Sequence, residues 1–512
     1  MKIQRTKNAV NSISWGLINK VFTLILPFII RTLVIYVFGV EYAGLNNLFS
    51  SILQVLNLAE LGMSTAIVYA MYKPIAEKDY ETLSSLLKYF KIVYQKIGIF
   101  VLGAGLCLIP GLKRLINGTY PKEINIYIIY VIYLLNTASS YLFFAYKTTL
   151  LSAYQRNDIA SKINTAVHFF QNIMQLIIIL VLKDFYIYLA VTVIFTNINN
   201  LLCHRRATEL FPEIQPKGEI SKENKEQIQQ NVKGLMISKA CQVSRNAFDT
   251  ICISSFIGLT ATTIYSNYYF LMTTITGFLT ILLTSISAGI GNSIETESVE
   301  KNYQDLHKFN FMFMWVSGWC TSCFYCMYQP FMKIWMGQKL MLPFGCVILL
   351  CIYFLLLRAG DIRSQYFNAC GLWWKGRWVS VLEAVANLFL NITLGYFFQI
   401  WGILIATILT ILFIDHIGCA VLVFKNYFKG YSVKSYFLVC SYYFAVICII
   451  CGITGFICDL VPISGIFGLI LRFGVCSIIT NVLFYAVYRK NKWFNMSFNM
   501  AKRILGSLSR RK

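Results

Sequence analysis

The sequence predicts an all-α polytopic membrane protein with about fourteen transmembrane helices. Of its 512 residues, 57% are hydrophobic and only 13% are charged, whereas a soluble globular surface needs roughly a quarter charged residues. The hydrophobic residues form blocks of about twenty, the length of helix that crosses the ~30 Å hydrocarbon core of a bilayer. Long apolar runs such as Ile173–Leu182 also exclude a transmembrane barrel, whose strands alternate in polarity from residue to residue.

Each predicted span is a hydrophobic block bounded by charged, glycine, proline or aromatic residues. The fourteen blocks are 12–38, 43–72, 92–112, 124–146, 164–183, 185–203, 233–257, 262–290, 309–330, 343–365, 378–399, 401–424, 436–458 and 465–488.

Two further segments predict amphipathic helices at the inner membrane surface. Segment 73–91 begins with a proline suited to the first turn of a helix and then alternates charged residues with apolar pairs. The tail after residue 488 has the same pattern, with Trp493 and Phe494 expected among the lipid headgroups.

The distribution of Lys and Arg sets the predicted orientation. The net charge of +23 would suggest nucleic acid in a soluble protein, but here the cations lie mostly between the apolar blocks, and we expect no nucleic-acid partner. With the N-terminus in the cytoplasm, the inside loops hold 32 Lys and Arg and the outside loops hold six. Cytoplasmic loops carry this excess in membrane proteins, so we expect both termini in the cytoplasm.

The longest polar connector, 204–232, divides six spans from eight and predicts a cytoplasmic linker between two lobes. The halves resemble each other: a shift of 219 residues superimposes Phe38-Gly39-Val40 on Ile257-Gly258-Leu259. Since each half has six spans and begins and ends on one side, the implied repeat is parallel. The predicted organisation is an N-lobe at 1–203, the linker 204–232, a C-lobe at 233–424, two extra spans at 425–488 and a basic cytoplasmic tail at 489–512.

Ionisable residues inside the spans are candidates for function, because a charge at mid-bilayer costs on the order of 3 kcal/mol. We expect such residues to face protein or a water-filled cavity. The candidates for a substrate-binding cavity are Lys20, Arg31, Glu60, Lys239, Arg245, Asp249, Arg358, Asp361 and Arg363.

Several of these residues also have a purely structural interpretation. Arg245 and Asp249 are spaced to pair on one helix, and Arg358 and Asp361 have a similar spacing. Arg363 is near enough to the inner surface for its side chain to reach the headgroups. These interpretations stay open from the sequence alone.

Two other groups are candidates for ion coupling, His168 and Glu383. A hydrogen-bonded structural role competes with a proton relay at His168. Asp415, His416 and Arg472 in the late spans favour packing or headgroup contacts.

Enzymatic and metal-binding motifs are missing from the sequence. No phosphate-binding glycine loop, HExxH motif or plausible Ser/His/Asp arrangement is found, so we expect no enzyme and no cofactor beyond a coupling H⁺ or Na⁺. Cys320, Cys323 and Cys326 have no His or further Cys cluster near them in sequence. They predict buried thiols rather than a metal site.

Three loose motifs carry a resemblance to a known family. They are Phe38-Gly39-Val40-Glu41-Tyr42-Ala43-Gly44-Leu45 after the first span, Asp249-Thr250 before Phe256-Ile257-Gly258, and Asn387-Leu-Phe-Leu-Asn391 before Trp401-Gly402-Ile403. With the fourteen spans, two lobes and cationic first and seventh spans, the whole chain resembles the bacterial polysaccharide flippases of O-antigen, capsule and teichuronic-acid pathways. Their superfamily also contains the multidrug and toxin extruders (MATE-like exporters) and the lipid II flippase.

The resemblance implies transport of an undecaprenyl-diphosphate-linked oligosaccharide from the inner to the outer leaflet of the bacterial cytoplasmic membrane, by alternating access through a cationic central cavity. It also implies contacts with membrane lipids, with a polysaccharide polymerase and with glycosyltransferases; we expect a monomer. Two alternatives remain. A multidrug or toxin cation antiporter belongs to the same superfamily but favours an acidic or aromatic chamber, and a membrane glycosyltransferase or polymerase generally needs a larger outside loop.

Overall fold

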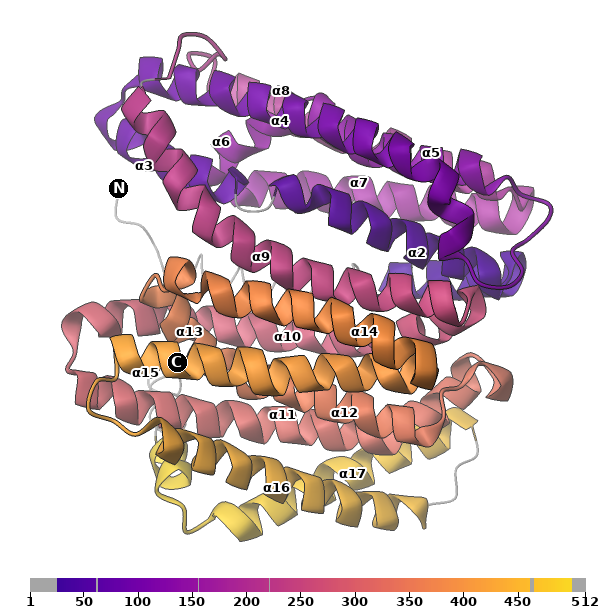
Figure 1. The fold of residues 1–512 in the computed structure, drawn as a ribbon, viewed down its shortest axis with the longest axis vertical. Helices are drawn as coiled ribbons and strands as arrows, with labels where there is room; N and C mark the ends of the chain where they lie inside the picture. Colours follow the sequence, from indigo (N-terminus) through magenta and orange to yellow (C-terminus); the bar gives the residue numbers. More distant parts are fainter. Residues whose placement is uncertain (1–24, 61–62, 155, 221, 461–464, 500–512) are drawn as a thin grey trace, which may run out of the picture. The chain divides into compact units, whose positions relative to one another are not determined.

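A computed structural model describes residues 25–60, 63–154, 156–220, 222–460 and 465–499 (Figure 1). Every regular element in these ranges is a helix, and they contain no strand. The prediction of an all-α polytopic membrane protein is confirmed. By its internal contacts the chain divides into unit 1, Met1–Thr263, and unit 2, Ile264–Lys512.

Unit 1 begins with a described helix at Ile25–Phe38, whose last five residues form the π-helix η1. The α-helices that follow are α2 Val40–Leu56, α3 Met63–Glu77, α4 Tyr80–Leu108, α5 Ile126–Leu142, α6 Thr148–Ala153, α7 Asn157–Ile177, α8 Phe185–Leu210 and α9 Lys222–Phe256. Their core includes fully buried side chains of α3, α4 and α6, among them Ile67, Leu87, Phe90 and Leu150.

The segment 73–91 is not a separate surface helix, which corrects the prediction. Pro74 lies inside α3, and α4 starts at Tyr80 and continues through the hydrophobic block without a break. Asp79 caps α4 by accepting hydrogen bonds from the backbone N–H and the hydroxyl of Thr82, at 2.9 and 2.6 Å. These bonds hold the pKa of Asp79 below its usual value.

The predicted span 43–72 is interrupted near its centre. α2 ends at Leu56, the 3₁₀ turn η2 covers Asn57–Glu60, and α3 begins at Met63. The polar residues of this segment compete with regular helical hydrogen bonding. The interruption places Glu60 at the middle of the run 40–77.

The segment 204–232, predicted as a linker, is partly helical. α8 continues to Leu210 and α9 already begins at Lys222, so only 211–221 connects them. α9 contacts α2 and α3 and therefore lies in unit 1, whereas the sequence analysis assigned its apolar part to the C-lobe. The division into lobes rests on the sequence repeat and stays a prediction.

Unit 2 contains most of α10 and all later elements. The α-helices are α10 Leu259–Thr296, α11 Val299–Trp335, α12 Phe344–Ala359, α13 Asp361–Ala369, α14 Trp373–Thr410, α15 Ile417–Asn426, α16 Val433–Asp459 and α17 Gly465–Tyr488, with the π-helix η7 Ile411–His416 between α14 and α15. α11 contacts both α16 and α17. Their shared core includes the buried Phe311, Tyr443, Ile447 and Phe484.

α14 contains two arms rather than one straight helix. Gln399 has φ 53° and ψ −132°, outside the helical region, and Asn387 on the first arm hydrogen-bonds Thr407 on the second. The chain therefore folds back at Gln399. This turn lies between the two predicted spans 378–399 and 401–424.

The start of the basic tail packs against unit 2. Trp493 stacks on His307 with ring centroids 5.1 Å apart, and Phe494 stacks on Trp315 at 5.7 Å. Both rings therefore contact α11, and their place among the lipid headgroups stays a prediction. Residues 500–512 lie outside the described ranges.

Eight helices in the described ranges are long and apolar enough to cross a membrane, or nine if the bent pair Ile126–Leu142 and Ala145–Ala153 is one span. The number is below fourteen partly because the first predicted span, 12–38, begins outside the described residues, and partly for physical reasons. The two arms of α14 belong to one continuous segment, the predicted second span is broken at η2, and α9 and α11 carry many polar residues. The eight are Tyr80–Leu115, Asn157–Leu182, Phe185–Leu210, Leu259–Thr296, Phe344–Ala369, Trp373–Asn426, Val433–Asp459 and Gly465–Tyr488.

Candidate functional site

The interruption at η2 brings ionisable groups together inside unit 1. The hydroxyl of Tyr94 on α4 donates a hydrogen bond of 2.8 Å to Oε1 of Glu60, and Ser64 lies beside the same hydroxyl. Lys239 on α9 is within electrostatic range of the Glu60 carboxylate. Three separate segments thus contribute to one polar cluster, which we call the Glu60 cluster: Glu60, Ser64, Tyr94 and Lys239.

Non-helical backbone at membrane depth is tolerated where it is buried in protein or lines a water-filled cavity, and binding sites of transporters are commonly built at broken helices. The Glu60 cluster combines a broken span with a carboxylate and an ammonium group. It is therefore the candidate site of unit 1.

Arg31 lies elsewhere in unit 1. Its guanidinium is within electrostatic range of the Tyr188 hydroxyl on α8, and Tyr188 stacks on Phe185 with ring centroids 5.6 Å apart. Among the described residues, Arg31 is thus associated with α8. Lys20, the other candidate of the first predicted span, lies outside the described residues.

Arg245 and Asp249 are both buried in unit 1, with 9% and 1% exposure. They lie on α9, one helical turn apart, and Asp249 is within electrostatic range of Cys252. Lys239 lies further toward the start of the same helix. α9 therefore carries three of the six predicted cavity residues of unit 1.

His168 lies on an exposed surface of α7. Two glutamines later on the same helix, Gln171 and Gln175, are buried, and Gln175 donates a hydrogen bond to Thr192 on α8. These buried polar residues join α7 to α8.

In unit 2, Arg363 is the centre of a buried polar cluster. Its side chain is 1% exposed, and it donates to the backbone carbonyl of His416 at 2.6 Å and to Oδ2 of Asp415 at 3.3 Å. The expectation that Arg363 reaches the headgroups is therefore wrong. η7 supplies both partners, and π-turns of this kind are frequent at functional sites because they disturb regular helical hydrogen bonding.

Nη1 of Arg363 also contacts Nδ1 of His416 at 3.2 Å. A guanidinium has only donors, so this contact requires an unprotonated Nδ1 and a neutral imidazole. Gly360 leaves the necessary room, because a Cβ at this position would lie 2.9 Å from Nη2 of Arg363.

Arg358 and Asp361 form the ion pair that their spacing indicated. Nη1 of Arg358 is 2.8 Å from Oδ2 of Asp361, and their side chains are 8% and 17% exposed. Arg358 lies in the last turn of α12 and Asp361 begins α13, so the pair spans the junction at Gly360. This pair fixes the segment that holds Arg363.

Glu383 and two asparagines form a buried polar stripe along the first arm of α14. Glu383, Asn387 and Asn391 are at most 2% exposed and follow one another at intervals of four residues. Asn387 donates to the hydroxyls of Thr407 and Thr410 at 3.2 and 3.4 Å.

The other end of this stripe approaches the Arg363 cluster. Glu383 is within electrostatic range of Cys419, and Cys419 donates to Oδ1 of Asp415 at 3.4 Å. Carboxylate, amide and hydroxyl oxygens in such an arrangement are suited to hold a small hard cation or a proton.

Sequence reasoning did not identify Tyr94, Asp415 or His416 as members of these clusters. Tyrosine is common in the spans, with 32 in the chain, so Tyr94 carried no distinguishing signal. Asp415 and His416 were noted but were expected to serve packing or headgroup contacts. A carboxylate deep in an apolar block requires a cationic partner. This requirement is the sequence signal that could have connected Asp415 with Arg363.

No protein-family model matches the chain, and no curated protein matches it in sequence. Solved structures do match in fold. A lipid II flippase, MurJ, in an inward closed conformation has a TM-score of 0.66 at 15% identity, covering 92% of this chain and 98% of its own. This chain has the fold of the MATE and MurJ transporters.

Two structures of MATE transporters also match this chain in fold. An inward-facing multidrug resistance MATE family transporter of the MOP superfamily has a TM-score of 0.62 at 11% identity, covering 82% of this chain and 95% of its own. A mutant of the Vibrio cholerae MATE transporter VcmN has a TM-score of 0.54 at 13% identity, with the same two coverages. The resemblance that the sequence motifs indicated is confirmed at the level of the MATE fold.

Proposed function

We propose that this chain is a flippase that moves a polyprenyl-diphosphate-linked oligosaccharide from the inner to the outer leaflet of the bacterial cytoplasmic membrane. The observation that carries the proposal is the match to a lipid II flippase over 92% of the chain, a larger share than the 82% matched by the multidrug transporter. The transporters in this comparison also support a transport role rather than an enzymatic one.

The charges inside the spans support an anionic substrate. A diphosphate headgroup carries about two negative charges, and ammonium and guanidinium groups replace its hydration. Lys239 interacts with the single negative charge of Glu60 in this structure. A diphosphate that enters this region competes for Lys239 with a larger charge, and the electrostatic attraction scales with that charge.

We propose different roles for the other predicted cavity residues. Arg31, Arg245 and Asp249 belong with Lys239 to unit 1, and we propose that the cations among them contribute to the positive field that the headgroup meets. Arg358 and Arg363 are held by Asp361 and Asp415, so we assign them to the framework of unit 2.

Lys239 gives the direct test. The Lys239→Gln protein, purified and reconstituted in proteoliposomes, is expected to flip a fluorescent undecaprenyl-diphosphate disaccharide at least tenfold more slowly than the wild type, which corresponds to about 1.4 kcal/mol. Flipping is measured as loss of protection from an impermeant quencher. The control is Lys113→Gln, an exposed lysine of the 3₁₀ helix η3, Ile109–Leu115, which is expected to leave the rate unchanged.

Two results would contradict the proposal. If the Lys239→Gln protein flips the lipid at the wild-type rate, this lysine does not bind the anionic headgroup. Wild-type proteoliposomes that flip no lipid-linked sugar but export ethidium identify the chain as a cation antiporter of the alternative class.

We further propose that Glu383 binds the coupling cation, a proton or Na⁺. Its burial at 2% exposure beside amide and hydroxyl oxygens supports this role. Glu383→Gln is expected to leave passive substrate binding intact and to abolish the acceleration of flipping by an imposed proton or sodium gradient. Gradient-dependent flipping at the wild-type level in this variant would show that the carboxylate has no part in coupling.

A further inference from the structure

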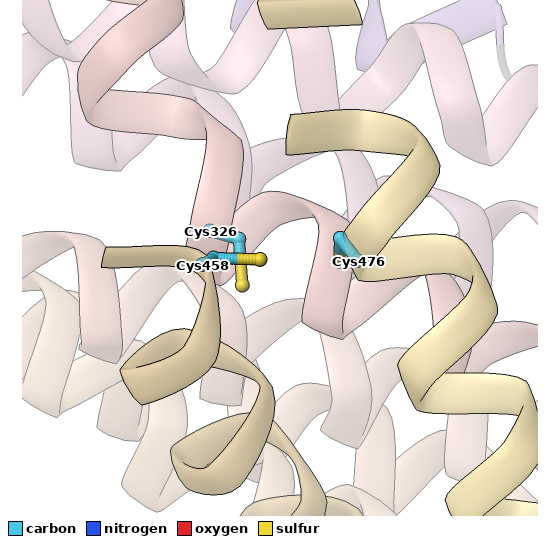
Figure 2. Close-up of side chains that lie close together, drawn as sticks. All are labelled: Cys326, Cys458 and Cys476. Carbon is cyan, nitrogen blue, oxygen red and sulfur yellow. The ribbon is translucent and has the colours of Figure 1, made fainter. Parts of the chain in front are cut away.

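Three cysteines that are far apart in sequence meet inside unit 2. Cys326 on α11, Cys458 on α16 and Cys476 on α17 are at most 2% exposed, and their Sγ atoms all lie within 4.8 Å of one another. Figure 2 shows the three residues on their helices, with the sulfur atoms of Cys326 and Cys458 close together. We call this group the thiol cluster.

A fourth sulfur lies next to the thiol cluster. Cys323 is one helical turn before Cys326 on α11, and its Sγ is 4.0 Å from that of Cys476. In the sequence, the cysteines of α11 had no further ligand nearby. The fold supplies the missing ligands from α16 and α17.

The spacing of the sulfur atoms fits a metal ion better than a disulfide. Zn–S bonds of about 2.3 Å place the sulfurs of a tetrahedral site about 3.8 Å apart, and the sulfurs here lie within 4.8 Å of one another, with 4.0 Å between those of Cys323 and Cys476. A disulfide requires an S–S distance of about 2.05 Å, and all of these cysteines are free thiols.

The surrounding charge favours a divalent ion. Three thiolates carry three negative charges, and the guanidinium of Arg472 is within electrostatic range of Cys458. Zn²⁺ cancels two of the three thiolate charges, which matters in a low-dielectric interior. Arg472 lies beside the remaining charge and also pairs with Asp459, whose side chain is 75% exposed.

A cavity gives access to the thiol cluster. It has a volume of about 690 Å³ and is lined by Cys326, Asp459 and Arg472, among others. Gln329 and Lys333 on the next turns of α11 line it as well. The cavity therefore borders Cys326, one member of the thiol cluster.

We propose that Cys326, Cys458 and Cys476 bind a thiophilic divalent metal ion of the Zn²⁺ class, with Cys323 available as the fourth ligand. Thiolate ligands select Zn²⁺ and other soft ions over Mg²⁺ and Ca²⁺. The bound ion joins the α16–α17 pair to α11. This inference is independent of the proposed transport function.

The test uses Cd²⁺ as a spectroscopic probe for the full-length protein, purified in detergent with a phosphine reductant. The wild type is expected to bind one Cd²⁺ per chain with a sulfur-to-cadmium charge-transfer band, and Cd²⁺ is expected to displace bound Zn²⁺, because thiolates prefer the softer ion. The triple variant C326A/C458A/C476A is expected to lose the band. A matched control, C252A/C346A/C351A, replaces three cysteines that are similarly buried and is expected to retain it.

A second measurement needs no variant, in case the triple replacement fails to fold. X-ray absorption on the Zn²⁺-loaded wild type is expected to show three or four sulfur ligands at about 2.3 Å. A first shell of nitrogen and oxygen would overturn the proposal. So would a disulfide between any two of the three cysteines in freshly isolated membranes, or an unchanged cadmium band in a monodisperse triple variant.

Discussion

Arg363 illustrates how a cation is kept inside an apolar helix bundle. Its guanidinium is almost inaccessible and is held by a carboxylate, a carbonyl and an imidazole from one π-helix. Each of these groups gives up hydrogen bonds to water when it contacts the guanidinium. Removing one partner of such a cluster is therefore far more destabilising than removing one partner of a surface pair.

The stability of unit 2 is expected to depend on this residue. Arg363→Met removes the donor to Oδ2 of Asp415 and to the His416 carbonyl. We expect a loss of about 3 kcal/mol, at the lower end of the range for buried pairs because the Asp415 side chain is 34% exposed. Denaturant or thermal unfolding in detergent measures the change.

An exposed ion pair provides the comparison for Arg363. Arg206 and Glu209 have side chains that are 58% and 59% exposed, so Arg206→Met is expected to cost at most about 1 kcal/mol. The double variant R363M/D415N is expected to recover part of the stability. Equal losses for Arg363→Met and Arg206→Met would show that the buried cluster adds nothing to stability.

At the level of single residues, the sequence identified which charges lie inside the spans but not their partners. The pair of Arg358 and Asp361 could be predicted from the sequence because the two residues lie three positions apart. The partners of Arg363 are more than fifty residues away, and only the packing of α13 against α15 and η7 brings them together. The same limit hid Tyr94, which reaches Glu60 from another helix.

At the level of elements, the two glycines that the sequence repeat aligned have nearly the same backbone conformation. Gly39 has φ 124° and Gly258 has φ 120°, which residues with a Cβ rarely adopt. Each of them separates two consecutive helices. This similarity supports the repeat that the shift of 219 residues indicated.

The turn at Gly258 also approaches α2 closely. A Cβ at Gly44 would lie 2.5 Å from the backbone oxygen of Leu259, and the hydroxyl of Thr263 donates to the Val40 carbonyl at 2.7 Å. A backbone oxygen cannot move aside as the end of a flexible side chain can. The close approach therefore requires glycine at position 44.

Two glycine-to-alanine variants test this contact. Gly44→Ala is expected to lower the stability of unit 1 by about 1–3 kcal/mol because it overpacks the contact. Gly103→Ala on α4, where a Cβ meets nothing within 4 Å, is expected to be neutral or to stabilise the helix by up to about 1 kcal/mol. Unfolding of the two purified proteins in detergent measures both changes, and a loss of stability for Gly103→Ala at least as large as for Gly44→Ala would contradict this account.

Most element positions followed from the pattern of apolar residues, and the exceptions have local causes. The break at η2 was missed because Asn57 and Glu60 lie in a block that is otherwise rich in apolar side chains. Helix α9 was predicted too short because its polar start gives no apolar signal, although its residues have good helix propensity. The apolar pattern reports how readily a segment enters lipid, not whether its backbone is continuous.

At the level of the whole molecule, the orientation of the chain in the membrane stays a prediction. With 32 cations in the loops assigned to the inside and six in those assigned to the outside, we expect 73–91, 204–232, 292–308 and both termini on the cytoplasmic side. This scheme assigns Lys217 to the inside, and Lys113 and Lys339 to the outside.

Single cysteines at these three exposed positions, introduced into a cysteine-free background, measure the orientation. An impermeant maleimide added to intact cells is expected to label K113C and K339C and to leave K217C unlabelled until the cells are opened. Labelling of K217C in intact cells would invert the scheme and would contradict transport toward the outer leaflet.

The interruption at η2 also determines where the second span bends. A continuous α-helix is stiff because each turn is hydrogen-bonded to the next, whereas the four residues of η2 form only a short 3₁₀ turn between two helices. Thermal bending of this span is therefore concentrated at the turn that carries Glu60. Any tilt of α3 relative to α2 changes the distance between the Glu60 carboxylate and the Lys239 ammonium, so the shape of the span and the strength of this attraction change together.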